Sequence, residues 1–96
     1  MRSKPKALAR AREYGWEKRG IKGMTVEKYD AMLKSQKGKC ALCGNPPKKI
    51  RLSVDHNHKT GNIRGLLCYR CNRYVLGRLT LIQCKAMVDY LEKYDG

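Results

Sequence analysis

The sequence predicts a small α+β domain in which a β-hairpin and a short helix are flanked by longer helices. Two Cys-x-x-Cys pairs, Cys40 with Cys43 and Cys68 with Cys71, bracket the central segment. Between them, apolar residues alternate with polar residues on both sides of a glycine-containing turn, as in a pair of strands. Before and after them, apolar residues recur every three or four positions, as in helices. The hairpin is therefore expected to be the centre of the fold.

The charge of the chain indicates a nucleic-acid partner. The net charge is +14, from 22 basic and 8 acidic residues, and such an imbalance in a small chain is typical of proteins that bind a polyanion. Solubility is the simpler explanation, but it needs far less charge. An anionic membrane surface is a further alternative. However, no segment combines a basic face with a Trp- and Leu-rich face, and none approaches the roughly 20 apolar residues that span a membrane.

The cysteines are predicted to hold a metal ion. The 96-residue chain has no Phe and one Trp, so its aliphatic core needs an additional staple. Five Cys are available. An odd number argues against a fully paired disulfide scaffold, and the charged N-terminus lacks the apolar run of a signal peptide. We therefore expect a reduced, cytoplasmic protein.

The first segment, residues 1–23, is predicted to be a basic arm rich in Lys and Arg. A short helix is expected over residues 6–16, broken near Gly15, Gly20 and Gly23. One interpretation is a solvated basic arm that is frayed in isolation. The other is a strip of phosphate contacts, with Tyr14 and Trp16 packed back on the domain. The two interpretations are compatible, because such arms often become ordered on binding.

The folded domain is expected to comprise residues 24–96 and to begin with a helix. Thr25 can cap the first turn of this helix, and Gly38 supplies a stop. Tyr29 and Met32 fall on one face of it. We interpret these two side chains as core and assign them no chemistry.

Two strands and two further helices follow. Ile50, Leu52 and Val54 alternate with polar residues, which is the period of a half-buried strand. Residues 59–62 are predicted to turn, and residues 63–67 to form the returning strand.

A short helix is expected at about residues 71–76, stopped by Gly77. The last helix spans residues 79–94, where apolar residues recur at three and four. Cys84, inside that helix, has no partner nearby in sequence and is interpreted as a small buried hydrophobic residue.

The strongest chemical signal is the pair of cysteine knuckles. Cys40, Cys43, Cys68 and Cys71 can give zinc a closed tetrahedron of four thiolates, which is typical of structural sites. A dithiol redox pair is an alternative, but the surrounding βαβ pattern that it needs is missing. An iron–sulfur cluster is less common at this spacing. Zinc is therefore the expected metal.

Once four cysteines complete the zinc site, four further polar residues have no assigned role: Asp55, His56, His58 and Asn72. The first three end the first strand, and Asn72 opens the short helix, so the layout places Asp55 and Asn72 across a small cleft. A surface His-x-His is commonly solvated, and the other two could merely cap a turn and a helix. Because neighbouring side chains of a strand point to opposite faces, Asp55 and His56 can reach one phosphate only if the chain bends between them.

In their order and spacing, these residues resemble the recombination endonuclease VII group of phage HNH nucleases, which belong to the His-Me finger (ββα-metal) nucleases. The resemblance covers about residues 23–77. It implies a ββα-metal domain with flanking helices. The motif is carried by Asp55-His56-x-His58, Thr60-Gly61, Arg64-Gly65-Leu66-Leu67-Cys68 and Cys71-Asn72.

By that resemblance the protein is expected to be a Mg²⁺- or Mn²⁺-dependent DNA endonuclease. Asp55 and Asn72 would hold the catalytic metal, which prefers oxygen ligands. His56 would be the general base, a role that suits a neutral imidazole near pH 7. His58 would assist at the phosphate or the metal.

Arg64, Arg70 and Arg73 are placed to bind phosphates of DNA. The rival interpretation is a non-catalytic, zinc-stapled DNA-binding module that acts with other phage proteins in a packaging or recombination complex. Asp55, His56 and Asn72 argue against it, because a module that only binds has no use for a base beside a metal site. A nuclease that acts on RNA, and the oligomeric state, stay open.

Overall fold

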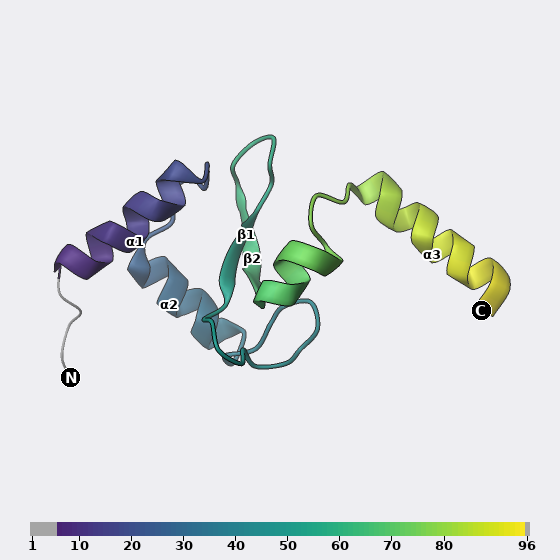
Figure 1. The fold of residues 1–96 in the computed structure, drawn as a ribbon, viewed down its shortest axis with the longest axis horizontal. Helices are drawn as coiled ribbons and strands as arrows, with labels where there is room; N and C mark the ends of the chain where they lie inside the picture. The colour runs from purple at the N-terminus through teal and green to yellow at the C-terminus, as the bar shows by residue number, and fades with distance from the viewer. Residues whose placement is uncertain (1–5, 96) are drawn as a thin grey trace.

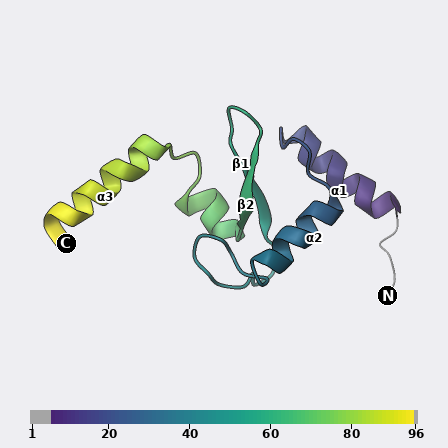
Figure 2. The same ribbon diagram turned by 180° about the vertical axis from the view of Figure 1, so that it is seen from behind.

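A computed structural model describes residues 6–95 of the protein, with side chains from residue 8 onwards. The elements occur in the order α1 (Lys6–Lys18), α2 (Val26–Ser35), β1 (Ser53–His56), β2 (Ile63–Leu67), η1 (Cys71–Val75) and α3 (Leu81–Asp95). The two strands pair in one antiparallel sheet. In Figure 1, α1 and α2 lie on one side of this hairpin and α3 extends away on the other, and the view from behind in Figure 2 agrees. The predicted α+β fold is confirmed.

Helix α1 is longer than predicted, because it continues through Gly15 to Lys18. A glycine inside a helix costs only about 1 kcal/mol, which packing of the next turn offsets. Trp16 is buried and its ring stacks on that of Tyr29, with centroids 5.7 Å apart. The predicted packing of Trp16 is thus confirmed, whereas Tyr14 is exposed and its predicted packing is wrong.

The end of the N-terminal segment contacts the tip of the hairpin. The backbone N–H of Lys22 donates to the carbonyl oxygen of Gly61 at 3.0 Å. The approach is so close that a Cβ on Gly61 would lie 2.6 Å from the carbonyl oxygen of Gly20. The division of the chain at residue 23 stays a prediction, and residues 1–5 and 96 lie outside the described part.

Helix α2 begins and ends as the sequence predicts. The Thr25 Oγ1 accepts the backbone N–H of Lys28 at 3.1 Å, and Gly38 follows the helix with a φ of +72°. Gln36, just after the helix, pairs with the outer edge of β2. Its Nε2 donates to the Leu66 carbonyl at 2.9 Å, and its Oε1 accepts the Leu66 N–H at 3.0 Å. A side-chain amide thus satisfies backbone groups that a third strand would otherwise pair.

Strand β1 starts later than predicted. Ile50 is 56% exposed and lies in a loop, whereas Leu52 and Val54 are buried as expected. The two prolines that precede it, Pro46 and Pro47, have no N–H to donate to a ladder. The alternation of apolar residues is therefore real, but of Ile50, Leu52 and Val54 it is Val54 that lies in the strand.

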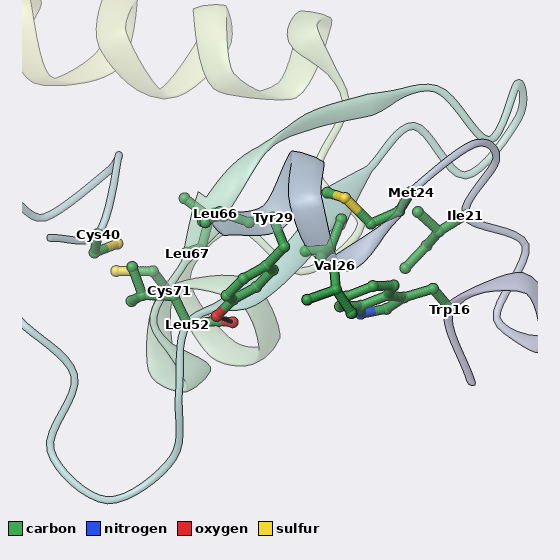
Figure 3. Close-up of a cluster of buried hydrophobic side chains, with 11 residues drawn as sticks. Trp16, Ile21, Met24, Val26, Tyr29, Cys40, Leu52, Leu66, Leu67 and Cys71 are labelled. Atoms are coloured by element: carbon green, nitrogen blue, oxygen red, sulfur yellow. Dashed lines mark hydrogen bonds between the residues drawn. The ribbon is translucent and has the colours of Figure 1, made fainter. Parts of the chain in front are cut away.

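The core lies between α2 and the hairpin (Figure 3). Tyr29 spans it, and its hydroxyl donates to the Leu52 carbonyl at 2.5 Å. Helix α3 contributes no buried residue, and its Cys84 is half-buried rather than buried. No helix in the described part of the chain is long and apolar enough to cross a bilayer. The buried cluster comprises Trp16, Ile21, Met24, Val26, Tyr29, Cys40, Leu52, Val54, Leu66, Leu67 and Cys71.

Candidate metal centre and active site

The four predicted zinc ligands lie together. The sulfur atoms of Cys40, Cys43, Cys68 and Cys71 are all within 4.8 Å of one another, and those of Cys43 and Cys68 are 3.9 Å apart. A tetrahedral zinc ion with Zn–S bonds of about 2.3 Å separates its sulfur ligands by about 3.8 Å. Figure 3 shows the sulfur atoms of Cys40 and Cys71 facing each other. The cluster can therefore hold a zinc ion with little movement.

Backbone groups of the first knuckle stabilise a thiolate. The N–H groups of Leu42 and Cys43 point at the Cys40 sulfur, at 3.4 and 3.5 Å. Although burial raises the pKa of Cys40, such hydrogen bonds lower it to about 6 overall. Burial and its three thiol neighbours instead raise the pKa of Cys71 to about 12. Thiols this close cannot all ionise without a cation among them, and a divalent metal ion supplies that cation.

Asp55 is the buried carboxylate among the four polar site residues predicted outside the zinc cluster. It is 5% exposed, and the Arg64 guanidinium binds it with both arms, Nε to Oδ2 at 2.7 Å and Nη2 to Oδ1 at 2.9 Å. The hydrogen bonds to Asp55 raise the pKa of Arg64 above its ordinary value. Arg64 was predicted to bind phosphate. In this structure, the Nε and Nη2 of its guanidinium bind Asp55.

A β-bulge explains how Arg64 reaches this carboxylate. Asp55 pairs with Gly65 and His56 with Ile63, so the register shifts between Asp55 and His56 and leaves Arg64 as the extra residue of β2. Bulges bend the strand and turn side chains out of the regular alternation. The register shift falls at the step where the sequence predicts a bend, and His56 is the last residue of β1. That Asp55 and His56 can reach one phosphate stays a prediction.

The two histidines are in contact at the end of the strand. The ring centroids of His56 and His58 are 4.5 Å apart, with the planes tilted by 43°. His56 is half-buried and His58 is exposed. Burial, and then the positive charges of His58, Arg64 and Arg78, lower the pKa of His56, against the opposing effect of Asp55. His56 is therefore biased towards the neutral imidazole at pH 7.

Asn57 organises the turn that carries the two histidines. Its Oδ1 accepts the backbone N–H groups of Lys59 and Thr60 at 2.8 and 3.0 Å. Its carbonyl accepts the N–H of Gly61 at 2.7 Å. Sequence reasoning missed this residue, although an asparagine two residues before Lys59 can cap such a turn through its side chain.

Asn72 lies on η1, where the sequence predicts a short helix, and this helix is of the π type. Its defining bond runs from the Leu76 N–H to the Cys71 carbonyl, five residues back, at 2.8 Å. The Asn72 side chain is half-buried and forms no hydrogen bond with any residue from 8 to 95. No hydrogen bond among residues 8–95 joins the Asn72 side chain to Asp55 or to the two histidines.

The remaining arginines differ in their freedom to bind DNA. Arg70 and Arg73 are exposed on and beside η1, with the Arg73 guanidinium 5.9 Å from the centre of the Tyr74 ring. Arg78, which sequence reasoning missed, lies close enough to His56 to affect its pKa. It follows Gly77, where the chain turns with a φ of +51°, and only the folded structure could bring it near the histidine.

Comparison with known proteins identifies relatives over most of the chain. The chain is 46% identical to the Gene 59 protein of Mycobacterium phage D29 over 83 residues, which is 81% of the chain and 50% of that protein. It is 44% identical to the Gene 59 protein of Mycobacterium phage L5 over 81 residues, 79% of the chain and 49% of that protein. The chain thus spans about half the length of these relatives. No solved structure matches it significantly.

The family profile of recombination endonuclease VII matches residues 3–93. The match is longer than the resemblance over residues 23–77 that the motif alone indicates, and it takes in both α1 and most of α3. Members of this family are nucleases, and nucleases act on DNA or RNA chains through their phosphodiester bonds. The chain belongs to the recombination endonuclease VII family.

Proposed function

We propose that the protein is a Mg²⁺- or Mn²⁺-dependent endonuclease of the HNH (His-Me finger) type that hydrolyses phosphodiester bonds in DNA. The observation that carries the proposal is found at the end of β1. A buried carboxylate, Asp55, adjoins in sequence a half-buried imidazole, His56, whose pKa is lowered, and the strand register shifts between the two residues. Membership of the nuclease family supports the same interpretation.

Asp55 and Asn72 are the side chains that would hold the catalytic metal. Each carboxylate oxygen has two acceptor positions, and Arg64 occupies one on each, so Asp55 retains capacity for a cation. Asn72 offers an amide oxygen with no partner among the described residues. An oxygen-only donor set suits Mg²⁺. When bound, such an ion neutralises charge on the phosphate and stabilises the leaving oxygen.

His56 is the general base in this proposal. Its lowered pKa keeps one ring nitrogen free of a proton at pH 7, so the imidazole can accept a proton from the attacking water. His58 is exposed and in ring contact with His56, which suits a side chain that positions the phosphate. Arg64 holds the Asp55 carboxylate in one orientation by its two-armed contact, as partners of metal ligands commonly do.

The charge of the chain supports DNA as the substrate. The net charge is +14, and Arg70 and Arg73 are exposed next to Asn72. The similarity to two phage proteins supports action in the cytoplasm of an infected host cell, together with other phage DNA-processing proteins. The family description supports a role in recombination.

A non-catalytic DNA-binding module is the second candidate, and one observation favours it. Both oxygens of Asp55 are already bound by Arg64, as in an ion pair that only stabilises a fold. A zinc-stapled module of this kind would bind DNA equally well without His56.

Cleavage of supercoiled plasmid separates the two candidates. The purified, zinc-loaded chain is incubated with plasmid with and without Mg²⁺ or Mn²⁺, beside the variants His56→Ala and Asp55→Asn. Asp89→Asn, on α3, is the matched control for the loss of one carboxylate. We expect metal-dependent nicking or linearisation by the wild type and the control, and none by the other two. Intact plasmid in every lane, with DNA binding retained, would establish the non-catalytic module.

A further inference from the structure

A groove of about 650 Å³ lies beside the cysteine cluster, and three of the four clustered cysteines line it. One wall is the loop after the first knuckle, and the other is the segment from the second knuckle into η1. Neither proposed active-site metal ligand lines it. Its lining comprises Leu42, Cys43, Asn45, Pro46, Pro47, Lys48, Lys49, Ile50, Cys68, Tyr69, Arg70, Cys71 and Val75.

The apolar part of the groove is unusually exposed. Leu42, Ile50, Tyr69 and Val75 keep 51%, 56%, 43% and 50% of their surfaces accessible. These side chains come from both walls, so they form one patch and not scattered surface residues. An apolar patch inside a concave surface is typical of a binding site. Ile50 in particular continues the alternation of β1 without entering the core.

Apart from the clustered cysteines, the charged side chains of the groove are all basic. Lys48, Lys49 and Arg70 line it, and none of its lining residues is acidic. Its ligand should therefore combine an apolar body with negative charge. A nucleotide has this combination, because its base offers flat apolar faces and its phosphate carries the charge.

We propose that this groove binds an unpaired nucleotide of single-stranded nucleic acid. The base lies against Tyr69 and the aliphatic side chains, and the flanking phosphates contact the three cationic ones. Tyr69 is held in place by Tyr74, whose ring meets it edge-on at a centroid distance of 5.9 Å. A fixed aromatic ring stacks with any base, since every base has a π-face. Recognition in the groove is therefore expected to be independent of sequence.

The position of the groove favours nucleic acid over an acidic peptide. Residues 68–75 form one wall and also carry Asn72 and Arg73, so a strand bound along η1 would continue from one site into the other. The inference rests on nucleic acid as the partner, which it shares with the proposed function. It does not depend on cleavage.

Binding of single-stranded oligonucleotides without added Mg²⁺ tests the inference. The zinc-loaded full chain is titrated, by fluorescence anisotropy, into labelled twelve-nucleotide oligo-dT and into an abasic oligonucleotide of equal length and charge. We expect about 5- to 100-fold tighter binding of oligo-dT, the usual effect of stacking one base on an aromatic residue. The double variant Ile50→Ser/Tyr69→Ala should lose that preference and bind both at the abasic level.

A matched control comes from α3. Ile82→Ser/Tyr90→Ala changes the same residue types at positions that are 80% and 64% exposed, and it should keep the preference. Zinc content is measured for each variant. If the groove double variant loses zinc, Ile50→Ser alone replaces it, because Ile50 lies in a loop outside the core.

Lysine acetylation of the wild-type protein gives a second readout. Oligo-dT should protect Lys48 and Lys49 from acetylation, as read by mass spectrometry, while Lys93 on α3 stays reactive. An unchanged preference in the groove variant, or equal affinity of the wild type for the two oligonucleotides, would overturn the inference. So would binding of an acidic, leucine-containing peptide that oligo-dT does not displace. Plasmid cleavage in the presence of Mg²⁺ could still succeed in each case, so the two proposals fail separately.

Discussion

The two ends of the hairpin carry polar clusters that differ in one respect: one is closed on itself and the other is open to a ligand. At one end Ser53 pairs with Leu67, and the next residue, Cys68, enters a cluster of four thiols whose members face one another. At the other end His56 pairs with Ile63, and the imidazoles lie half-buried or exposed. The cysteine cluster closes on itself, as a structural metal site does. The histidine end stays open to a ligand. The difference predicts that substitutions at the first end affect folding and those at the second end affect function.

The largest expected effect is at the cysteine end. Cys68→Ser removes one of four zinc ligands, and a structural zinc ion contributes about 10–16 kcal/mol in small domains. We expect the variant to lose zinc, by elemental analysis, and to lose its cooperative thermal transition, by circular dichroism. Cys84→Ser is the control and should change neither, because Cys84 lies outside the cluster. A Cys68→Ser protein with an unchanged melting temperature would mean that the cluster does not hold the fold together.

Loss of the proposed base should leave the fold intact. His56→Ala is expected to lower the cleavage rate by about 10²- to 10⁴-fold, the usual contribution of a general base, with zinc content and melting temperature unchanged. His58→Ala should cost less if it only positions the phosphate. If His58→Ala is inactive and His56→Ala cleaves within about tenfold of the wild type, the two roles are exchanged.

The pH dependence of cleavage sharpens this assignment. Burial and His58 lower the pKa of His56, so the neutral, proton-accepting form prevails from a lower pH than for an ordinary imidazole. The rate is therefore expected to rise with pH through a pKa below about 6.5. His58→Ala removes a positive neighbour, which should move this limb to higher pH. The rise of the rate with pH should disappear in His56→Ala. A rise that persists in this variant would mean that another group titrates there.

The sequence predicted the chemistry of both ends better than their contacts. Knuckle spacing identified the four thiols, and the Asp55 to His56 step was expected to bend because neighbouring strand residues face apart. The contact of Arg64 with Asp55 was not predicted, since it depends on the bulge, which is a property of strand pairing and not of local sequence. The predicted binding of phosphate by Arg64 stays a prediction. The apolar period of α3 predicted a helix correctly. The period could not reveal that no residue of α3 is buried. Periodicity indicates that a helix has an apolar face, but it does not say which other element covers that face.

Breaking the ion pair between Arg64 and Asp55, at the histidine end of the hairpin, is expected to lower the free energy of unfolding by an intermediate amount. Arg64→Gln leaves a buried carboxylate short of partners, and such a loss costs about 1–3 kcal/mol. The Arg64 side chain is 40% exposed, so water limits the penalty to the lower part of that range. Arg70→Gln is the control, and as an exposed substitution it should stay within about 0.5 kcal/mol. Urea denaturation measures both. Equal midpoints would show that the ion pair adds nothing to the fold.

The smallest effect on the fold, and a specific effect on DNA binding, is expected from α1. Its buried Trp16 and the neighbouring Arg12, which lies over the rings of Trp16 and Tyr29 at 5.1 and 4.8 Å, join it to the core. Deleting the arm would therefore damage the fold and confuse the result. Arg10 on α1 and Arg19 directly after it are exposed, and glutamine at position 10 preserves helix propensity.

The readout for this double variant is the slope of log affinity for duplex DNA against log salt concentration. The slope should become shallower by up to about 0.9 for each phosphate that the two arginines no longer neutralise, with an unchanged melting temperature. Lys85→Gln/Lys93→Gln on α3 removes the same charge from another exposed helix. If α1 contacts DNA, only the α1 variant flattens the slope. An equal change in both variants would mean that net charge alone, and not the position of α1 beside the hairpin, determines binding.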